Sequence, residues 1–314
     1  MLDRHGPTLW NSLSDQQVFL TTILAEPPGN GNALSYTNCV PDLHHLSGRG
    51  GRVFPLYRDS NSSTPNESHE LLRFLQRVVG DAANPENLFC YIAGVLAHPG
   101  YTERFHDELE VPGPRVPLTK DPALFQRAVG LGMQVIAWQT YAERFPEAIG
   151  TTRGRVPSGA ARLETAIPDD PLKYPQNLNE VTYTAITREL KVGEGLITNV
   201  DPRIWQYQVS GLRVVRSWLG YRMKERSGRK SSPLDDIRPE RWTLDMSNEL
   251  MELLWVLEGV IALEPAQNFL LAEIVAGPLF LASELPTPTD AERQPPKIGP
   301  RQQQGLGGEF DASL

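Results

Sequence analysis

The sequence predicts an α+β fold that is mostly helical and contains a small mixed or antiparallel β-sheet. Segments whose apolar residues recur at helical spacing alternate with short β-branched segments, and proline and glycine separate them. The 314 residues are 40% hydrophobic and 22% charged, so the chain can bury a substantial core. No segment approaches the ~20 apolar residues of a membrane span, and the N-terminus does not resemble a secretory signal.

The N-terminal part is predicted to supply strands at residues 18–24, 34–40 and 53–57. The first of these segments is β-branched and apolar, with the sequence V-F-L-T-T-I-L. Residues 27–32, P-P-G-N-G-N, form a turn or loop. Residues 1–16 are polar and mixed, and we expect them to form an N-terminal extension.

The middle of the chain is predicted to be helical. Asn84-Pro85 and Asp121-Pro122 each place a capping side chain before a proline in the first helical turn. The aromatic residues of the helix that begins at Asp121-Pro122 are interpreted as core rather than as a base-stacking platform. The predicted helices span residues 68–80, 84–97, 101–109 and 121–145.

Loops and short strands are predicted to follow. Residues 150–175 are rich in loops, and residues 181–190 and 195–199 form a hairpin that leads into a strand at 204–209. The N-terminal strands and those between 181 and 209 are expected to form one small sheet. Ser210-Gly211 ends the strand, and a helix begins whose apolar stripe comprises Leu212, Val215, Trp218, Leu219 and Met223.

The C-terminal part is predicted to contain two helices, one over residues 250–263 and one that begins at Pro265. Residues 17–284 are expected to form one compact unit. Residues 285–314 are rich in Pro, Gln and Gly, so we expect a disordered tail.

Positive charge is concentrated in residues 213–241. This segment has nine basic and four acidic residues, a net charge of +5, so the rest of a chain whose total is −8 carries −13. A local cationic surface on an acidic protein is typical of phosphate contacts, although a solvated helix surface gives the same pattern.

The glycine-rich residues 47–51 admit two interpretations. One interpretation is a phosphate-binding loop formed by the backbone with the neighbouring Arg49 and Arg52; the other, which we favour, is a turn whose glycines supply positive φ. No Gly-Lys-Ser/Thr follows, so it is not a Walker A loop. His44 and His45 have no second ligand pair, and no metal site is expected. Cys39 and Cys90 are too few for a disulfide framework and indicate free thiols in a reducing cytoplasm.

Several blocks of sequence resemble the C-terminal specificity domain of type ISP restriction-modification enzymes. The most specific is I-W-Q-Y-Q-V-S-G-x-R-V-x-x-S-W-L-x-Y-R over residues 204–222, followed by P-L-D-D-I-x-P-x-x-W. Residues 40–59, 88–105 and 257–266 supply further blocks in the same order. The resemblance covers about residues 17–280 and implies a fold like that of a target recognition domain.

The resemblance implies a module that recognises a target in double-stranded DNA. Cationic side chains would contact phosphates, and loops that match the family poorly, such as residues 150–175, would contact bases. Trp218 and Arg222 lie in the best-matched block, which favours scaffold or phosphate-contact roles over base reading. The candidate DNA-binding residues are Arg213, Arg216, Arg222, Lys224, Arg226, Arg229 and Lys230, with Arg49 and Arg52 secondary.

Motifs for catalysis are missing from the sequence. There is no N-P-P-[YF] loop of an adenine methyltransferase, no nucleophile elbow and no nuclease-type carboxylate cluster. The resemblance therefore implies that methylation, with S-adenosylmethionine as cofactor, belongs to a linked or partner methyltransferase domain in the cytoplasm. The alternative hypothesis is a protein-interaction module whose apolar residues 250–275 dock a methyltransferase or another subunit.

Overall fold

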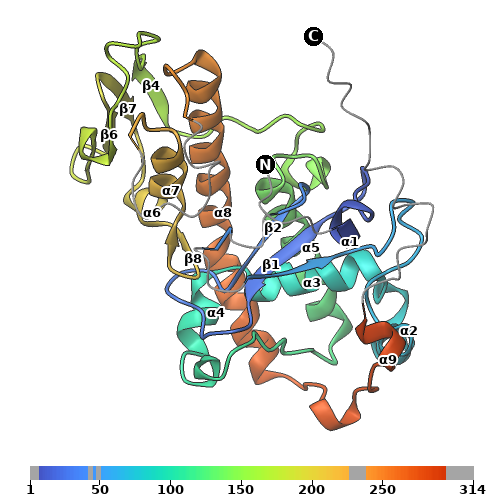
Figure 1. The fold of residues 1–314 in the computed structure, drawn as a ribbon. Coiled ribbons are helices and arrows are strands. Elements are labelled where there is room, and N and C mark those ends of the chain that lie inside the picture. The colour runs from blue at the N-terminus through green and yellow to red at the C-terminus, as the bar shows by residue number, and fades with distance from the viewer. Residues whose placement is uncertain (1–6, 42–44, 47–50, 226–237, 295–314) are drawn as a thin grey trace, which may run out of the picture.

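The computed structural model describes residues 7–41, 45–46, 51–225 and 238–294. It confirms an α+β chain in which helix, at 43%, outweighs strand, at 15%. The expectation of one small sheet is wrong, because the strands form separate antiparallel sheets that lie on two different cores. In Figure 1 the sheet containing β4 (Arg162–Thr165), β6 (Glu189–Val192) and β7 (Gly195–Thr198) lies at one end of the molecule. Helices α2 (His69–Val79) and α9 (Asp290–Arg293) lie at the other end.

The first sheet has the order β2-β1-β3 and confirms the three predicted N-terminal strands. All five residues of the central strand are buried, because strands flank it on both edges and helices cover it. Thr21 lies opposite both Ser35 and Val53 in the antiparallel register. The strands are β1 (Phe19–Ile23), β2 (Leu34–Thr37) and β3 (Gly51–Pro55).

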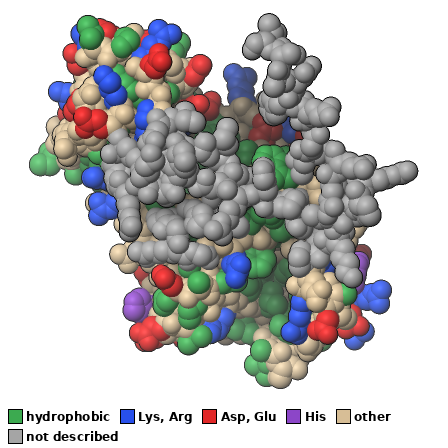
Figure 2. All heavy atoms as spheres, viewed as in Figure 1, with side chains coloured by type: hydrophobic (Ala, Val, Ile, Leu, Met, Phe, Trp, Pro, Cys, Tyr) green, Lys and Arg blue, Asp and Glu red, His purple; other side chains and the backbone are tan. Residues whose placement is uncertain are grey.

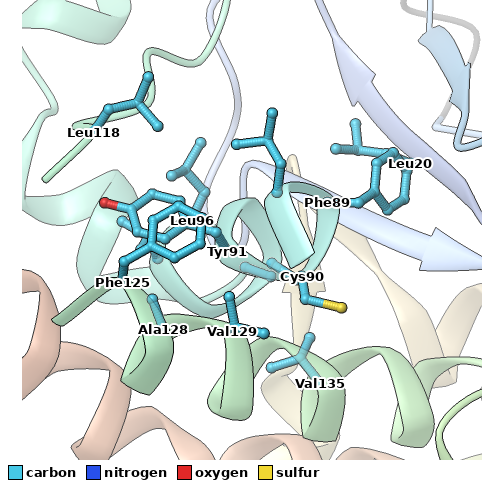
Figure 3. Packing of buried hydrophobic residues seen from close by; sticks show 14 of the residues in the cluster. Leu20, Phe89, Cys90, Tyr91, Leu96, Leu118, Phe125, Ala128, Val129 and Val135 are labelled. Carbon is cyan, nitrogen blue, oxygen red and sulfur yellow. The ribbon is translucent and has the colours of Figure 1, made fainter. Parts of the chain in front are cut away.

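Helices α2 to α5 pack against this sheet and form the first core with it. Asn84 accepts a hydrogen bond from the backbone N–H of Asn87, and Asp121 accepts from two N–H groups of the next helix, as the capping signals predict. Figure 3 shows Phe89 beside Leu20 of the sheet, and Tyr91 stacks on Phe125 with ring centroids 4.8 Å apart. The helices are α2 (His69–Val79), α3 (Pro85–Leu96), α4 (Pro99–Arg104) and α5 (Pro122–Gln139).

Helix α5 ends earlier than predicted. The prediction placed its end at Phe145-Pro146, but the helix stops at Gln139 because Tyr141 and Ala142 have positive φ angles of 53° and 61°. A helix cannot continue through left-handed backbone.

The second sheet has the order β4-β7-β6-β5 and lies on the second core. The predicted strand at 181–190 is wrong in its middle, because residues 185–188 form a turn that divides it into β5 and β6. Strand β4 lies within the segment predicted to be loop. The strands are β4 (Arg162–Thr165), β5 (Val181–Thr184), β6 (Glu189–Val192) and β7 (Gly195–Thr198).

Helix α8 (Leu244–Ala276) joins the two cores (Figure 1). The prediction of two helices is wrong, since α8 is continuous and Pro265 lies inside it. Residues of α8 up to Ile261 belong to the second core, and those from Leu270 onward belong to the first. By length and composition alone, α8 is long and apolar enough to cross a membrane. We attribute its apolar character to burial in two cores.

A second connection joins the β1–β2 loop to residues 207–209, which follow α6 (Pro202–Gln206). Asn32 forms a parallel bridge with Val209, and its side-chain amide donates to the carbonyl of Ala97 and to the hydroxyl of Tyr207. A side chain at Gly31 would overlap the carbonyl of Gln208, so only glycine permits this approach.

The described C-terminal segment returns to α2. Helix α9 (Asp290–Arg293) follows Thr289, and the Glu292 carboxylate accepts a hydrogen bond from the backbone N–H of His69. This segment includes the described start of the predicted tail, whose residues 295–314 lie outside the described residues. The proposed domain boundaries stay predictions.

Candidate nucleic-acid interface

The first half of the predicted strand at residues 204–209 is the end of a short helix. Asp201 accepts a hydrogen bond from the N–H of Arg203 at 2.8 Å, and Pro202 occupies the first turn, so α6 (Pro202–Gln206) begins there. The alternating aromatic residues conceal this capping signal. Only β8 (Gln208–Val209) at its end is extended.

The predicted break at Ser210-Gly211 is confirmed as a tight turn between β8 and β9 (Leu212–Arg213). Ser210 and Gly211 have φ angles of 49° and 84°, the positive pair that a two-residue hairpin of this twist requires. Helix α7 (Val214–Tyr221) follows at once, and Val215 and Leu219 of its predicted apolar stripe are buried.

Arg213 and Arg216 lie three residues apart in sequence at the start of α7. Arg213 is exposed at the position that precedes α7, and Arg216 follows one turn later. The guanidinium of Arg216 lies over the ring of Trp205 at 5.8 Å, and that ring stacks on Tyr183 of β5 with centroids 5.5 Å apart. Neither arginine forms an ion pair with any of the described residues.

Arg222 is held by its own chain. Its guanidinium lies 3.6 Å from the centroid of Trp218, and its Nη2 is 2.7 Å from the Oε2 of Glu249 on α8. The side chain is only 27% exposed. The structure therefore favours a scaffold role, one of the two roles considered for this residue.

The remaining cations of the basic segment differ in availability. Lys224 is exposed, and its backbone N–H donates to the carbonyl of Pro175. Arg238 donates to the carbonyls of Gly220 and Tyr221 at the end of α7, and Arg241 pairs with Asp169. The predicted contacts Arg226, Arg229 and Lys230 lie outside the described residues.

The secondary candidates lie apart from α7. Arg52 is exposed on β3 of the first sheet, and Arg49 lies outside the described residues together with most of the glycine-rich loop. Arg52 therefore lies on a different sheet from the one that contains β5 to β7. The two interpretations of residues 47–51, a turn or a phosphate-binding loop, stay predictions because residues 47–50 lie outside the described residues.

Two arginines of the segment predicted to contact bases are bound within the chain. Arg153 pairs with Glu143 at 2.8 Å, and this hydrogen bond raises the pKa of Arg153. Arg162 donates to the carbonyls of Gly159 and Ala161. The prediction that residues 150–175 contact bases stays a prediction, but these two side chains would first have to leave their partners.

Sequence reasoning missed Arg188. This residue is exposed in the β5–β6 turn with a φ of 55°, and its charge lies near Tyr183 and Asp201. The surrounding sequence T-A-I-T-R is β-branched and contains no glycine, proline or asparagine. A turn signal was therefore absent.

In Figure 2, Lys and Arg side chains at the second-sheet end are interspersed with Asp and Glu. Among the described residues, the cations around α7 and the second sheet that form no ion pair include Arg213, Arg216, Lys224, the newly located Arg188 and the exposed Lys191 of β6. No group of three or more metal-ligating side chains was found among the described residues.

A family model described as the Type ISP C-terminal specificity domain matches residues 1–253. No curated protein sequence matches the chain. Two solved structures share its fold over 82% of its length: a cryo-electron-microscopy DrdV–DNA complex (TM-score 0.57, 18% identity) and the ATP-dependent Type ISP restriction-modification enzyme LlaBIII bound to DNA (TM-score 0.52, 15% identity). The chain spans only 24% and 16% of those two proteins.

Proposed function

Because the chain belongs to the Type ISP C-terminal specificity-domain family, we propose that it recognises a target site in double-stranded DNA for a Type ISP-like restriction-modification enzyme. The observation that carries this proposal is the family match over residues 1–253. The fold it shares with DrdV and LlaBIII, both determined with DNA, supports the same function.

The cations around α7 support a division of labour between phosphate and base contacts. Arg213, Arg216 and Lys224 occupy the start and the end of one short helix, with no ion-pair partner among the described residues. Such side chains fix the position of a protein on a duplex but carry no sequence information. Base recognition then requires other side chains that reach a groove.

We further propose that catalysis belongs to another domain. The sequence lacks the N-P-P-[YF] loop of an adenine methyltransferase. A linked or partner methyltransferase domain would bind S-adenosylmethionine and modify the site that this module selects, in the cytoplasm where the DNA is found.

The fold buries much of the apolar surface that the protein-interaction alternative requires. Its proposed docking residues 250–275 lie within α8, and residues such as Leu254, Leu257 and Leu270 are buried in the chain's own cores. Phe269, which is 63% exposed, is one large apolar side chain of α8 still available to a partner.

Binding of the full chain to fluorescent duplexes of mixed sequence, measured by anisotropy across a salt series, tests the proposal. Replacing both Arg213→Ala and Arg216→Ala should weaken binding to every duplex. It should also reduce the slope of log K against log salt by up to about 1.8, since each phosphate contact contributes about 0.9. Arg226→Ala with Arg229→Ala should act in the same way.

A matched control removes two positive charges elsewhere. Arg73→Ala with Arg77→Ala changes two exposed arginines of α2, at the opposite end of the molecule in Figure 1. This pair should leave the salt slope unchanged. Absence of any binding at low salt, together with stable co-purification of a protein partner, would support the interaction module instead.

A further inference from the structure

We propose that the tip of the β5–β6 hairpin, residues 185–188, enters a groove of the bound duplex and contacts base edges there. This inference rests on the proposed function and assigns its sequence-reading element to a different place from the segment 150–175.

The hairpin tip projects without cover. All four residues between β5 and β6 are exposed, and the side chain of Ile186 is 95% exposed. A two-stranded ribbon of this kind fits the major groove of B-DNA, which is about 12 Å wide. The tip is therefore a feature of the described surface with both the shape and the reach to touch bases.

The side chains of the tip match the chemistry of base edges. Arg188 can donate two hydrogen bonds to a guanine, the Thr187 hydroxyl can accept one, and Ala185 and Ile186 can contact a thymine methyl group. The tip contains no carboxylate, and the neighbouring Glu189 already accepts a hydrogen bond from Thr187 at 2.8 Å.

The tip is also held in a fixed place relative to the phosphate-contacting cations. The carbonyl of Arg188 accepts a hydrogen bond from the N–H of Val200 at 2.9 Å, and the hydroxyl of Tyr183 donates to the carbonyl of Val200 at 2.9 Å. Tyr183 stacks on Trp205, which lies under Arg216. A rigid link of this kind places the tip in register with the α7 cations before DNA binds, which lowers the entropic cost of binding.

A second exposed apolar side chain lacks these features and serves as a control. Leu172 is 93% exposed, but it follows Asp169 and Asp170, and the adjacent Lys173 is paired with Glu194. Arg241 pairs with Asp169, but Asp170 forms no ion pair with a described residue, so the loop keeps a net negative charge that the phosphate backbone would repel. Leu172 and Ile186 are thus matched in exposure and differ in their electrostatic surroundings.

Site-directed photocrosslinking tests the proposal without knowledge of the target sequence. In a Cys39→Ser background, Ile186→Cys and Leu172→Cys are each labelled with a thiol-reactive photocrosslinker and irradiated with mixed duplexes. Cys90 is buried, and burial raises the pKa of its thiol, so it should stay unlabelled. We expect crosslinks to bases from position 186 and at least a tenfold lower yield from position 172.

The outcomes separate this inference from the proposed function. If the full chain binds no duplex, both proposals fail. If it binds but position 186 gives no more crosslink than position 172, DNA recognition stands and the hairpin assignment is overturned. Crosslinks from position 186 that map to sugar and phosphate instead of bases also overturn it.

Arg188→Asn provides a second test on sites selected by the wild-type chain from a random duplex pool. Asparagine tolerates the positive φ of this position, so the hairpin should keep its shape. We expect discrimination between the selected site and its single-base variants to fall about tenfold or more at one or two positions, with binding to unrelated duplexes nearly unchanged. Equal loss on all duplexes would show a phosphate contact and overturn the assignment.

Discussion

Replacement of Arg222 distinguishes a structural cation from a DNA contact. Its guanidinium stacks on Trp218 at 3.6 Å and pairs with Glu249 at 2.7 Å, so it ties the end of α7 to α8. Trp218 in turn meets the edge of Trp242, whose indole donates to Ser247 near the start of α8. We therefore expect Arg222→Ala to destabilise the contact between these two helices.

The expected magnitude follows from these contacts. A guanidinium on a tryptophan contributes about 0.5–2 kcal/mol. The ion pair contributes about 0.2–1 kcal/mol, because Glu249 is 52% exposed and solvent screens it. Arg222→Ala should then lower the free energy of unfolding by about 1–3 kcal/mol, and Tm by about 2–6 °C.

Thermal and urea unfolding followed by circular dichroism measure this change, and the lysine variant identifies its cause. Arg222→Lys keeps the charge but loses the planar stack, so it should retain only part of the stability. Salt slopes for DNA binding should remain close to wild type in both variants. A variant Arg222→Ala that unfolds like wild type and loses about 0.9 of the salt slope would refute the structural assignment.

Three further changes test the fold itself. Gly31→Ala should destabilise by about 2 kcal/mol or more, because its φ is +85° and the new methyl would overlap the carbonyl of Gln208. Gly113→Ala is the control in urea unfolding: its φ is +104°, but its new methyl would meet only Leu24 Cδ2 at an ordinary contact distance of 3.6 Å, so it measures the backbone strain alone. Burial raises the pKa of Glu67 from 4.5 to about 8. Between these values the folded chain keeps a proton that the unfolded chain has lost, so stability should fall by up to about 1.4 kcal/mol per pH unit as pH rises, and Glu67→Gln should abolish this slope in urea titrations from pH 5 to 8. Pro265→Ala should stabilise by about 1–3 kcal/mol, since Pro265 is an exposed interior residue of α8, and an unchanged urea midpoint would contradict that cost.

The elements that the sequence predicted well are those with a local chemical signal. Asn84-Pro85 and Asp121-Pro122 mark the starts of α3 and α5 because capping is settled within three residues. Both residues of the Ser210-Gly211 turn have positive φ, and glycine adopts such angles readily, so Gly211 marks the turn in the sequence. The α7 stripe was recognisable because its apolar period is helical.

The failures have non-local causes. The β5–β6 turn places Arg188 in left-handed backbone without glycine or asparagine, and a hydrogen bond from Val200, twelve residues away in sequence, holds it there. The division into two sheets depends on which core each strand joins. Likewise, the positive charge of the segment 213–241 was correctly counted, but Glu249 and Asp169, which neutralise two of its arginines, lie outside it.

The continuous α8 explains why two separate cores behave as one framework for the interface. A proline inside a helix is unfavourable because it removes one hydrogen bond and crowds the preceding turn. Pro265 lies between the last buried α8 residue of the second core, Ile261, and the first buried α8 residue of the first core, Leu270. The destabilisation of the helix by Pro265 therefore occurs where α8 leaves one core and enters the other. Since Asn32 and Gly31 connect the same two cores near Tyr207, the hairpin and α7 are braced against the first sheet at two points, α8 and this loop. Weakening either one should loosen the placement of the cations before it unfolds the chain.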